Sequence, residues 1–209
     1  MVFKKGRLAV YAAAFALLLL AIALSLGQSA IDTTRLANYS GFLSFSFISI
    51  ALLITPIRKI FPQFGPNASL YYARRAVGVS AFGFALAHFA LQFVFLFGMK
   101  VGLLGNALTG LAALAILFAL GITSTDYAVR KMGRNWFRLQ RLAYLAYPLI
   151  IIHAIQVGLD FRNANAFSVS FLAIAAITVA FEVARVAKTI SAKAKSDAAG
   201  AGKEQPKAD

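Results

Sequence analysis

Long apolar stretches, separated by short polar connections, make up most of this chain. At 1.5 Å per residue, a helix needs about 20 apolar residues to cross the ~30 Å hydrocarbon core of a bilayer. Stretches of about that length lie near residues 8–26, 37–55, 76–98, 102–123, 142–159 and 166–187. The pattern predicts an all-α, polytopic membrane protein, folded as a bundle of six transmembrane helices.

The first apolar stretch has basic residues before it and resembles a signal peptide at first sight. Its apolar run from Leu8 to Leu26 is longer than the ~7–15 residues of a signal-peptide core. We therefore expect a retained first helix. Cleavage near Gly27 is the alternative.

The distribution of Lys and Arg predicts an orientation. Basic residues concentrate near the N-terminus, in the second and fourth connections and in the C-terminal tail. The other connections carry only Arg35, Lys100 and Arg162. Because basic connections stay on the cytoplasmic side, we expect both termini in the cytoplasm and the lightly charged connections on the outer side.

Composition supports the membrane assignment and excludes a soluble class. The chain is 60% hydrophobic and 13% charged, with a mean hydropathy of +0.76. Its net charge of +14 is divided into clusters between apolar stretches, so we expect contact with membrane lipid and none with nucleic acid. We expect residues 1–190 to form the membrane domain. Residues 191–209 lack the apolar side chains of a core and are predicted to be a disordered tail.

Two histidines, His88 and His153, lie inside the predicted spans. Polar side chains are costly at that depth and are commonly functional. Counted from the basic residues Arg75 and Arg141, the histidines lie ~20 Å and ~18 Å along their helices. The two imidazoles are therefore predicted at nearly the same level of the membrane.

The surroundings of His88 suggest a flat ligand. Gly78, Ala81, Ala85, His88 and Gln92 recur at helical spacing and share one face. The chain has no cysteine, and two neutral imidazoles suit the axial positions of a haem iron better than a four-ligand zinc site. The alternative, equally compatible with spacing alone, is helix packing by the small residues and a hydrogen bond from each histidine to a neighbouring helix.

Three blocks of the chain form a recognisable set: ALLITPIRK (51–59), ARRAVGVSAFGFALAHFAL (73–91) and LGITSTDYAVRKMGRNWFRLQRLAYLAYPLIIIHAIQ (120–156). They resemble the ferric-reductase-like transmembrane family, and within it the haem-binding membrane subunits of protein-methionine-sulfoxide reductase systems. The resemblance implies an electron-transfer subunit of an oxidoreductase complex in the bacterial inner membrane, and not the substrate-reducing subunit. Electrons would pass from the quinone pool, or from a flavin reductase, to a periplasmic molybdopterin methionine-sulfoxide reductase that repairs oxidised proteins.

The resemblance also implies cofactor and site residues. His88 and His153 match histidines implicated as haem ligands in the family, which gives one haem b. The family is also associated with FMN, for which this sequence identifies no site. Arg74 and Arg75 could bind a flavin phosphate or a haem propionate through their guanidinium groups, with topological anchoring as the alternative. Gln140 stands where close relatives carry a histidine, and marks either a lost second haem site or a position that was never a ligand.

Two other functions remain compatible with the sequence. One is a stand-alone ferric or quinone reductase membrane domain, which would need a separate electron donor. The other is a small transporter or assembly factor, in which the histidines pack against other helices or relay protons.

Overall fold

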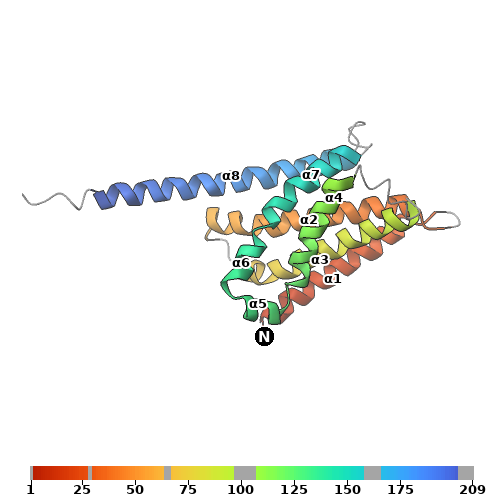
Figure 1. Ribbon diagram of the computed structural model, residues 1–209, viewed down its shortest axis with the longest axis horizontal. Coiled ribbons are helices and arrows are strands. Elements are labelled where there is room, and N and C mark those ends of the chain that lie inside the picture. Colours follow the sequence, from red (N-terminus) through yellow and green to blue (C-terminus); the bar gives the residue numbers. More distant parts are fainter. Residues whose placement is uncertain (1, 28–29, 64–66, 97–106, 158–165, 202–209) are drawn as a thin grey trace, which may run out of the picture.

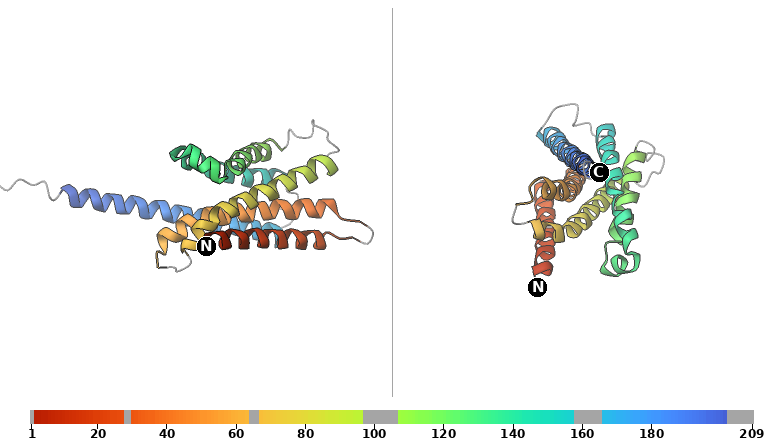
Figure 2. Two further views of the ribbon diagram at one scale, coloured as in Figure 1. Left: turned by 90° about the horizontal axis from the view of Figure 1, so that it is seen from below. Right: turned by 90° about the vertical axis from the view of Figure 1, so that its left-hand side faces the viewer.

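The computed structural model describes residues 2–27, 30–63, 67–96, 107–157 and 166–201. These residues are helical apart from turns and an isolated bridge between Leu26 and Ile31. In chain order the helices are α1 (Val2–Leu24), α2 (Thr33–Ile60), α3 (Asn67–Ala90), the π-helix η1 (Leu91–Leu96), α4 (Leu108–Ile122), α5 (Asp126–Met132), α6 (Arg134–Gln140), α7 (Ala143–Val157) and α8 (Ala166–Ala201). The helices α1, α2 and α3 run side by side, and α4 and α7 cross them at an angle (Figures 1 and 2).

The lengths and composition of these helices identify a multi-pass membrane protein. In the described part of the chain, four helices are long and apolar enough to cross a bilayer, and α4 with α5 forms a pair bent by 90° that could be a fifth span. Helix α7 has 15 described residues, or ~22 Å. The outer ends of the third, fourth and fifth predicted spans, with Lys100 and Arg162, lie outside the described residues. The count of six spans and the cytoplasmic termini stay predictions.

One end of the bundle gathers the basic segments. The starts of α1 and α3 meet α5 there, and the end of α2 lies beside α8 (Figure 1). The Asp126 carboxylate accepts a hydrogen bond from Arg75 and lies 3.6 Å from Arg7. These guanidinium groups lower the pKa of Asp126, with the Arg75 hydrogen bond as the largest cause. That these basic segments lie at one end of the bundle agrees with the sequence, in which basic connections alternate with lightly charged ones.

Helix α8 continues past the start of the predicted disordered tail. The sequence predicts disorder from residue 191, whereas α8 remains helical to Ala201 and extends beyond the bundle (Figure 1). Ala and Lys, which have high helix propensity, predominate in this segment. An existing helix adds residues without forming a new nucleus, so the segment continues α8 although it lacks a hydrophobic core. Residues 202–209 lie outside the described residues.

Helix α2 is the centre of the bundle. Of its most apolar window 56% is buried, compared with 22% for α8 and 6% for α1. Phe45 of α2 is 1% exposed and stacks on Tyr147 of α7 and Phe171 of α8, with ring centroids 5.5 and 3.8 Å apart. This aromatic stack joins α2 to both C-terminal helices.

Serine hydroxyls attach α2 to the two helices that carry the histidines. Ser44 donates to the carbonyl oxygen of Ala81 in α3 at 2.9 Å, and the hydroxyls of Ser49 and Tyr147 in α7 lie 3.0 Å apart. Few alternative partners exist for such groups within hydrocarbon, so these bonds help to fix α3 and α7 relative to α2.

We expect Tyr147→Phe to lower the free energy of unfolding by about 1 kcal/mol, because the variant keeps the ring stack but leaves the buried Ser49 hydroxyl without this partner. Denaturant unfolding of the detergent-solubilised protein measures the change. Tyr11→Phe, on an exposed position of α1, is the matched control and should unfold like the parent protein. Equal midpoints for both variants would contradict a structural role for the Tyr147 hydroxyl.

Candidate functional site

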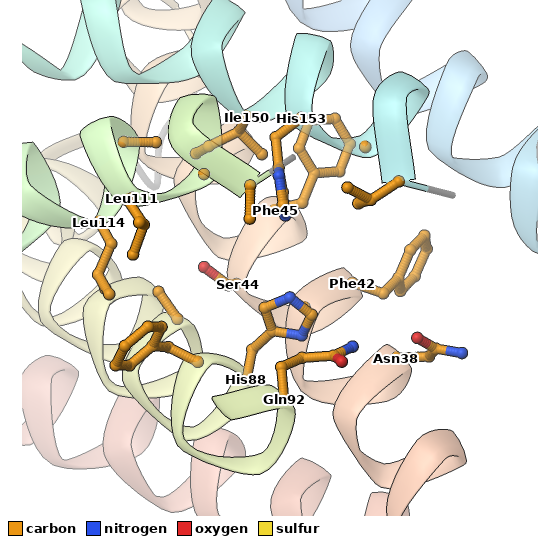
Figure 3. A pocket seen from close by; sticks show the side chains of 18 of the residues that line it. Asn38, Phe42, Ser44, Phe45, His88, Gln92, Leu111, Leu114, Ile150 and His153 are labelled. Carbon is orange, nitrogen blue, oxygen red and sulfur yellow. The ribbon is translucent and has the colours of Figure 1, made fainter. Parts of the chain in front are cut away.

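A cavity of about 360 Å³ lies among α2, α3, α4 and α7 and reaches the start of α8. Pockets for cofactors and small ligands are typically ~300–1,000 Å³. His88 from α3 and His153 from α7 point into the cavity towards each other (Figure 3). Their ring centroids are 6.4 Å apart, with the ring planes inclined at 77°. The lining is mostly apolar and aromatic, with Asn38, Ser44 and Gln92 as polar members.

His88 is held by a hydrogen bond to the backbone of α2. Its Nδ1 lies 2.8 Å from the carbonyl oxygen of Ala37, a fully buried residue. Because a carbonyl oxygen only accepts, Nδ1 carries the proton and donates it. The other ring nitrogen, Nε2, keeps its lone pair and faces the cavity (Figure 3). The arrangement prepares His88 Nε2 to bind a metal ion.

His153 differs from His88 in its second nitrogen. Its buried Nδ1 has no hydrogen-bond partner among the described residues. The backbone on either side of His153 is nevertheless fixed. Tyr147 is bonded to α2, and the Gln156 side chain accepts a hydrogen bond from Thr109 of α4 at 2.8 Å. Packing, and not a hydrogen bond to the ring, therefore holds the imidazole.

A glycine lies against each histidine ring. A Cβ built on Gly41 of α2 would be 2.9 Å from Nδ1 of His88, and one built on Gly110 of α4 would be 2.7 Å from Nδ1 of His153. Real Cβ atoms do not approach so closely, so a side chain at either position would displace the neighbouring histidine ring. The sequence does not reveal these two contacts, since nothing in it shows which of its 15 glycines will face a histidine.

The small-residue face around His88 serves two purposes. Ala85 and Gln92 line the cavity, as the helical spacing predicts for residues beside His88. Ala81, by contrast, is fully buried, and its carbonyl oxygen accepts the Ser44 hydrogen bond. Neither Ala81 nor Gly78 belongs to the cavity lining. On this face, then, Ala81 packs against α2, and only Ala85, His88 and Gln92 border the cavity.

The other predicted binding residues lie away from the histidine pair, and none of them lines the cavity. Arg74 donates from Nε to the carbonyl oxygen of Ala51 at 3.1 Å, and Arg75 pairs with Asp126. Gln140 ends α6, and its buried Nε2 has no partner among the described residues. The structure thus brings together His88 and His153 but not Arg74, Arg75 and Gln140, whose binding roles stay predictions.

Glu182 is a polar residue of α8 that our sequence reasoning missed. Its Oε2 accepts a hydrogen bond from Arg185 Nε at 2.7 Å, and the two side chains are 17% and 26% exposed. The guanidinium group also lies 5.7 Å from the ring centroid of Tyr144 in α7. A signal was present, because Glu182 is the only acidic residue inside the predicted spans and has an arginine three positions later.

The donor set of the cavity suits a metal that supplies its own equatorial ligands. In the described part of the chain no three His, Cys, Asp or Glu side chains gather as a metal site, which disfavours a four-ligand zinc centre there. Metal bonds to imidazole nitrogen are about 2.0–2.1 Å long, so rings 6.4 Å apart leave room for one ion between them. Two histidines facing across an apolar cavity fit the axial ligation of haem iron.

Comparisons with known proteins also indicate a haem-binding membrane protein. Residues 40–151 match the family described as "Ferric reductase like transmembrane component", a range that includes His88 and ends two residues before His153. The protein-methionine-sulfoxide reductase heme-binding subunit MsrQ of Agrobacterium fabrum is 32% identical over 120 residues, which span 54% of each chain. The MsrQ proteins of Brucella ovis and Brucella canis are each 29% identical over 167 residues, covering 76% of this chain and 72% of theirs. The chain thus matches about half the length of the first relative and nearly three quarters of the others.

Arg185→Met should destabilise the protein by about 3 kcal/mol, because it leaves the Glu182 carboxylate within the bilayer without its ion pair. The double variant Glu182→Leu/Arg185→Met should recover most of that loss, since no charge is then left unpaired. Denaturant unfolding in detergent measures both variants. If the double variant were no more stable than the single one, the unpaired charge would not be the cause of the loss.

Proposed function

The chain belongs to the family of ferric reductase like transmembrane components, and we propose that it is a membrane electron-transfer subunit that binds one haem b between His88 and His153. The observation that carries this proposal is the pair of imidazoles, 6.4 Å apart, facing one apolar cavity from α3 and α7. The relatives named as heme-binding subunits support it. Because the chain has only two histidines, one bis-histidine haem uses both of them.

Each part of the cavity has a role in this function. A bound haem supplies one-electron transfer at its iron. His88 offers Nε2 in a fixed orientation, because Nδ1 donates to Ala37. His153 lies on the opposite side of the cavity, where it would hold the iron together with His88. Phe42, Phe45 and Phe89 line the cavity and exclude water, which keeps the site in a low dielectric.

The partners we propose follow from the relatives and from the family resemblance. The relatives are subunits of protein-methionine-sulfoxide reductases. We therefore propose that electrons come from quinol, or from a flavin reductase, and pass to a periplasmic molybdopterin subunit that reduces methionine sulfoxide in oxidised proteins. The proposed location is the bacterial inner membrane, with both termini and the basic end of the bundle in the cytoplasm. At that end Arg74 and Arg75 remain candidates for an FMN phosphate.

Purified protein, expressed with ample haem, should contain about one haem b per chain in a pyridine haemochrome assay. His88→Ala and His153→Ala should each lose the low-spin, six-coordinate spectrum, because each variant removes one axial ligand. Gln140→Ala is the control and should keep both spectrum and haem content, since Gln140 does not line the cavity. A colourless parent protein, or unchanged spectra in both histidine variants, would overturn the haem assignment.

The proposed acceptor is tested separately in liposomes. Quinol-reduced protein should be reoxidised rapidly when the periplasmic methionine-sulfoxide reductase subunit and an oxidised protein substrate are added together, and slowly with either one alone. Absorbance of the reduced haem band follows the reaction. Fast reoxidation by a ferric chelate, with none by the reductase subunit, would instead favour a stand-alone ferric reductase.

A further inference from the structure

The two histidines of the cavity are restrained very differently. From this difference we propose that His153 is an exchangeable iron ligand, so that a small neutral molecule such as carbon monoxide binds ferrous haem on the His153 side while His88 keeps the haem in place. The proposal rests on the haem of the proposed function and adds a ligand-binding site to it. In this exchange the bond from iron to His153 would break and a bond from iron to the incoming ligand would form, and the iron would stay ferrous.

His88 is the firmly held ligand. Histidines that bind metals almost always donate their second ring N–H to a fixed acceptor, and losing that acceptor typically weakens metal binding 10–100-fold. His88 has such an acceptor in the Ala37 carbonyl, 2.8 Å away on α2. Because α2 is the most buried of the candidate spans and is bonded to α3 through Ser44, the acceptor and the histidine move together. Displacing His88 would break this hydrogen bond inside the membrane.

His153 lacks the corresponding restraint. Its buried Nδ1 meets no acceptor in the part of the chain that the structure describes. The backbone of α7 is fixed before it by Tyr147 and after it by Gln156, so the ring can leave the iron by a side-chain rotation without a helix movement. Exchange on this side therefore breaks one coordination bond and no hydrogen bond of the ring.

The cavity lining beside His153 favours a small neutral ligand. Gly110 presents no side chain, and Leu111, Ile150 and Ala154 are apolar. A charged molecule would lose its hydration there without gaining a partner, whereas a small neutral molecule loses little. Carbon monoxide fits these walls and binds only ferrous haem, so it reports on the exchange directly.

The two glycines provide a matched pair of variants. The methyl group of Gly110→Ala would press on the His153 ring from 2.7 Å, and no hydrogen bond from Nδ1 to a described residue opposes the displacement of that ring. We expect this variant to keep its haem and to bind carbon monoxide at least 10-fold more tightly than the parent. Gly41→Ala would press on His88 from 2.9 Å and strain the Ala37 hydrogen bond. It should lower the haem content without tightening carbon monoxide binding.

The experiment is a carbon monoxide titration of the full-length, haem-loaded, reduced protein in detergent, followed by the Soret band and by the infrared C–O stretch. The C–O stretch of the parent adduct should coincide with that of His153→Ala, which keeps haem through His88, and His88→Ala should lose its haem. No adduct at saturating carbon monoxide, a parent stretch that matches His88→Ala, a haem-free His153→Ala, or unchanged affinity in Gly110→Ala would each overturn the proposal. A parent protein without haem would overturn the proposed function instead.

Discussion

Inside a bilayer no bulk water is available to a polar group, so each one must find its partner within the protein. Helix α2 supplies most of the partners that define this structure. Its carbonyl oxygens accept from His88 and Arg74, and its serines bond to α3 and α7. Helix α2 is thus central both because it packs against the other helices and because it supplies their hydrogen-bond partners. Because α3 and α7 are both fixed to α2, the histidines that they carry meet across one cavity.

Because of the same constraint, buried polar atoms that have no hydrogen-bond partner are of particular interest. Buried polar atoms are hydrogen-bonded in most proteins, and the exceptions commonly mark sites of chemistry or bound water. In the described residues these exceptions include Nδ1 of His153, Nε2 of Gln140 and Oε1 of Glu182. His153 lies on the cavity, and as a proposed iron ligand it would be held less strongly than His88, because its Nδ1 has no acceptor among the described residues. The other two lie outside the cavity lining.

Close approach of backbone to imidazole is the second feature on which the site depends. Gly41 and Gly110 allow α2 and α4 to lie directly against the two rings, so neither histidine is pushed out of the cavity. Each ring thus has a close contact with the backbone of a neighbouring helix. The hydrogen bonds of the two rings differ, because among the described residues only His88 Nδ1 has an acceptor. The two proposed ligands are therefore packed alike but hydrogen-bonded differently.

The hydrophobic pattern determines the helical class and the membrane location, and the count from Arg75 and Arg141 predicts a shared level for His88 and His153, because the length of an apolar helix and the rise per residue are local properties. The helical spacing also places Ala85 and Gln92 beside His88. It could not show that Ala81 packs on α2, that Gly41 and Gly110 lie against the rings, or that, among the described residues, His88 finds an acceptor and His153 Nδ1 does not. Those facts depend on how helices far apart in the sequence rotate and dock. The sequence by itself thus determined which side chains are available as the proposed iron ligands, and only the tertiary structure decided how firmly each of them is held.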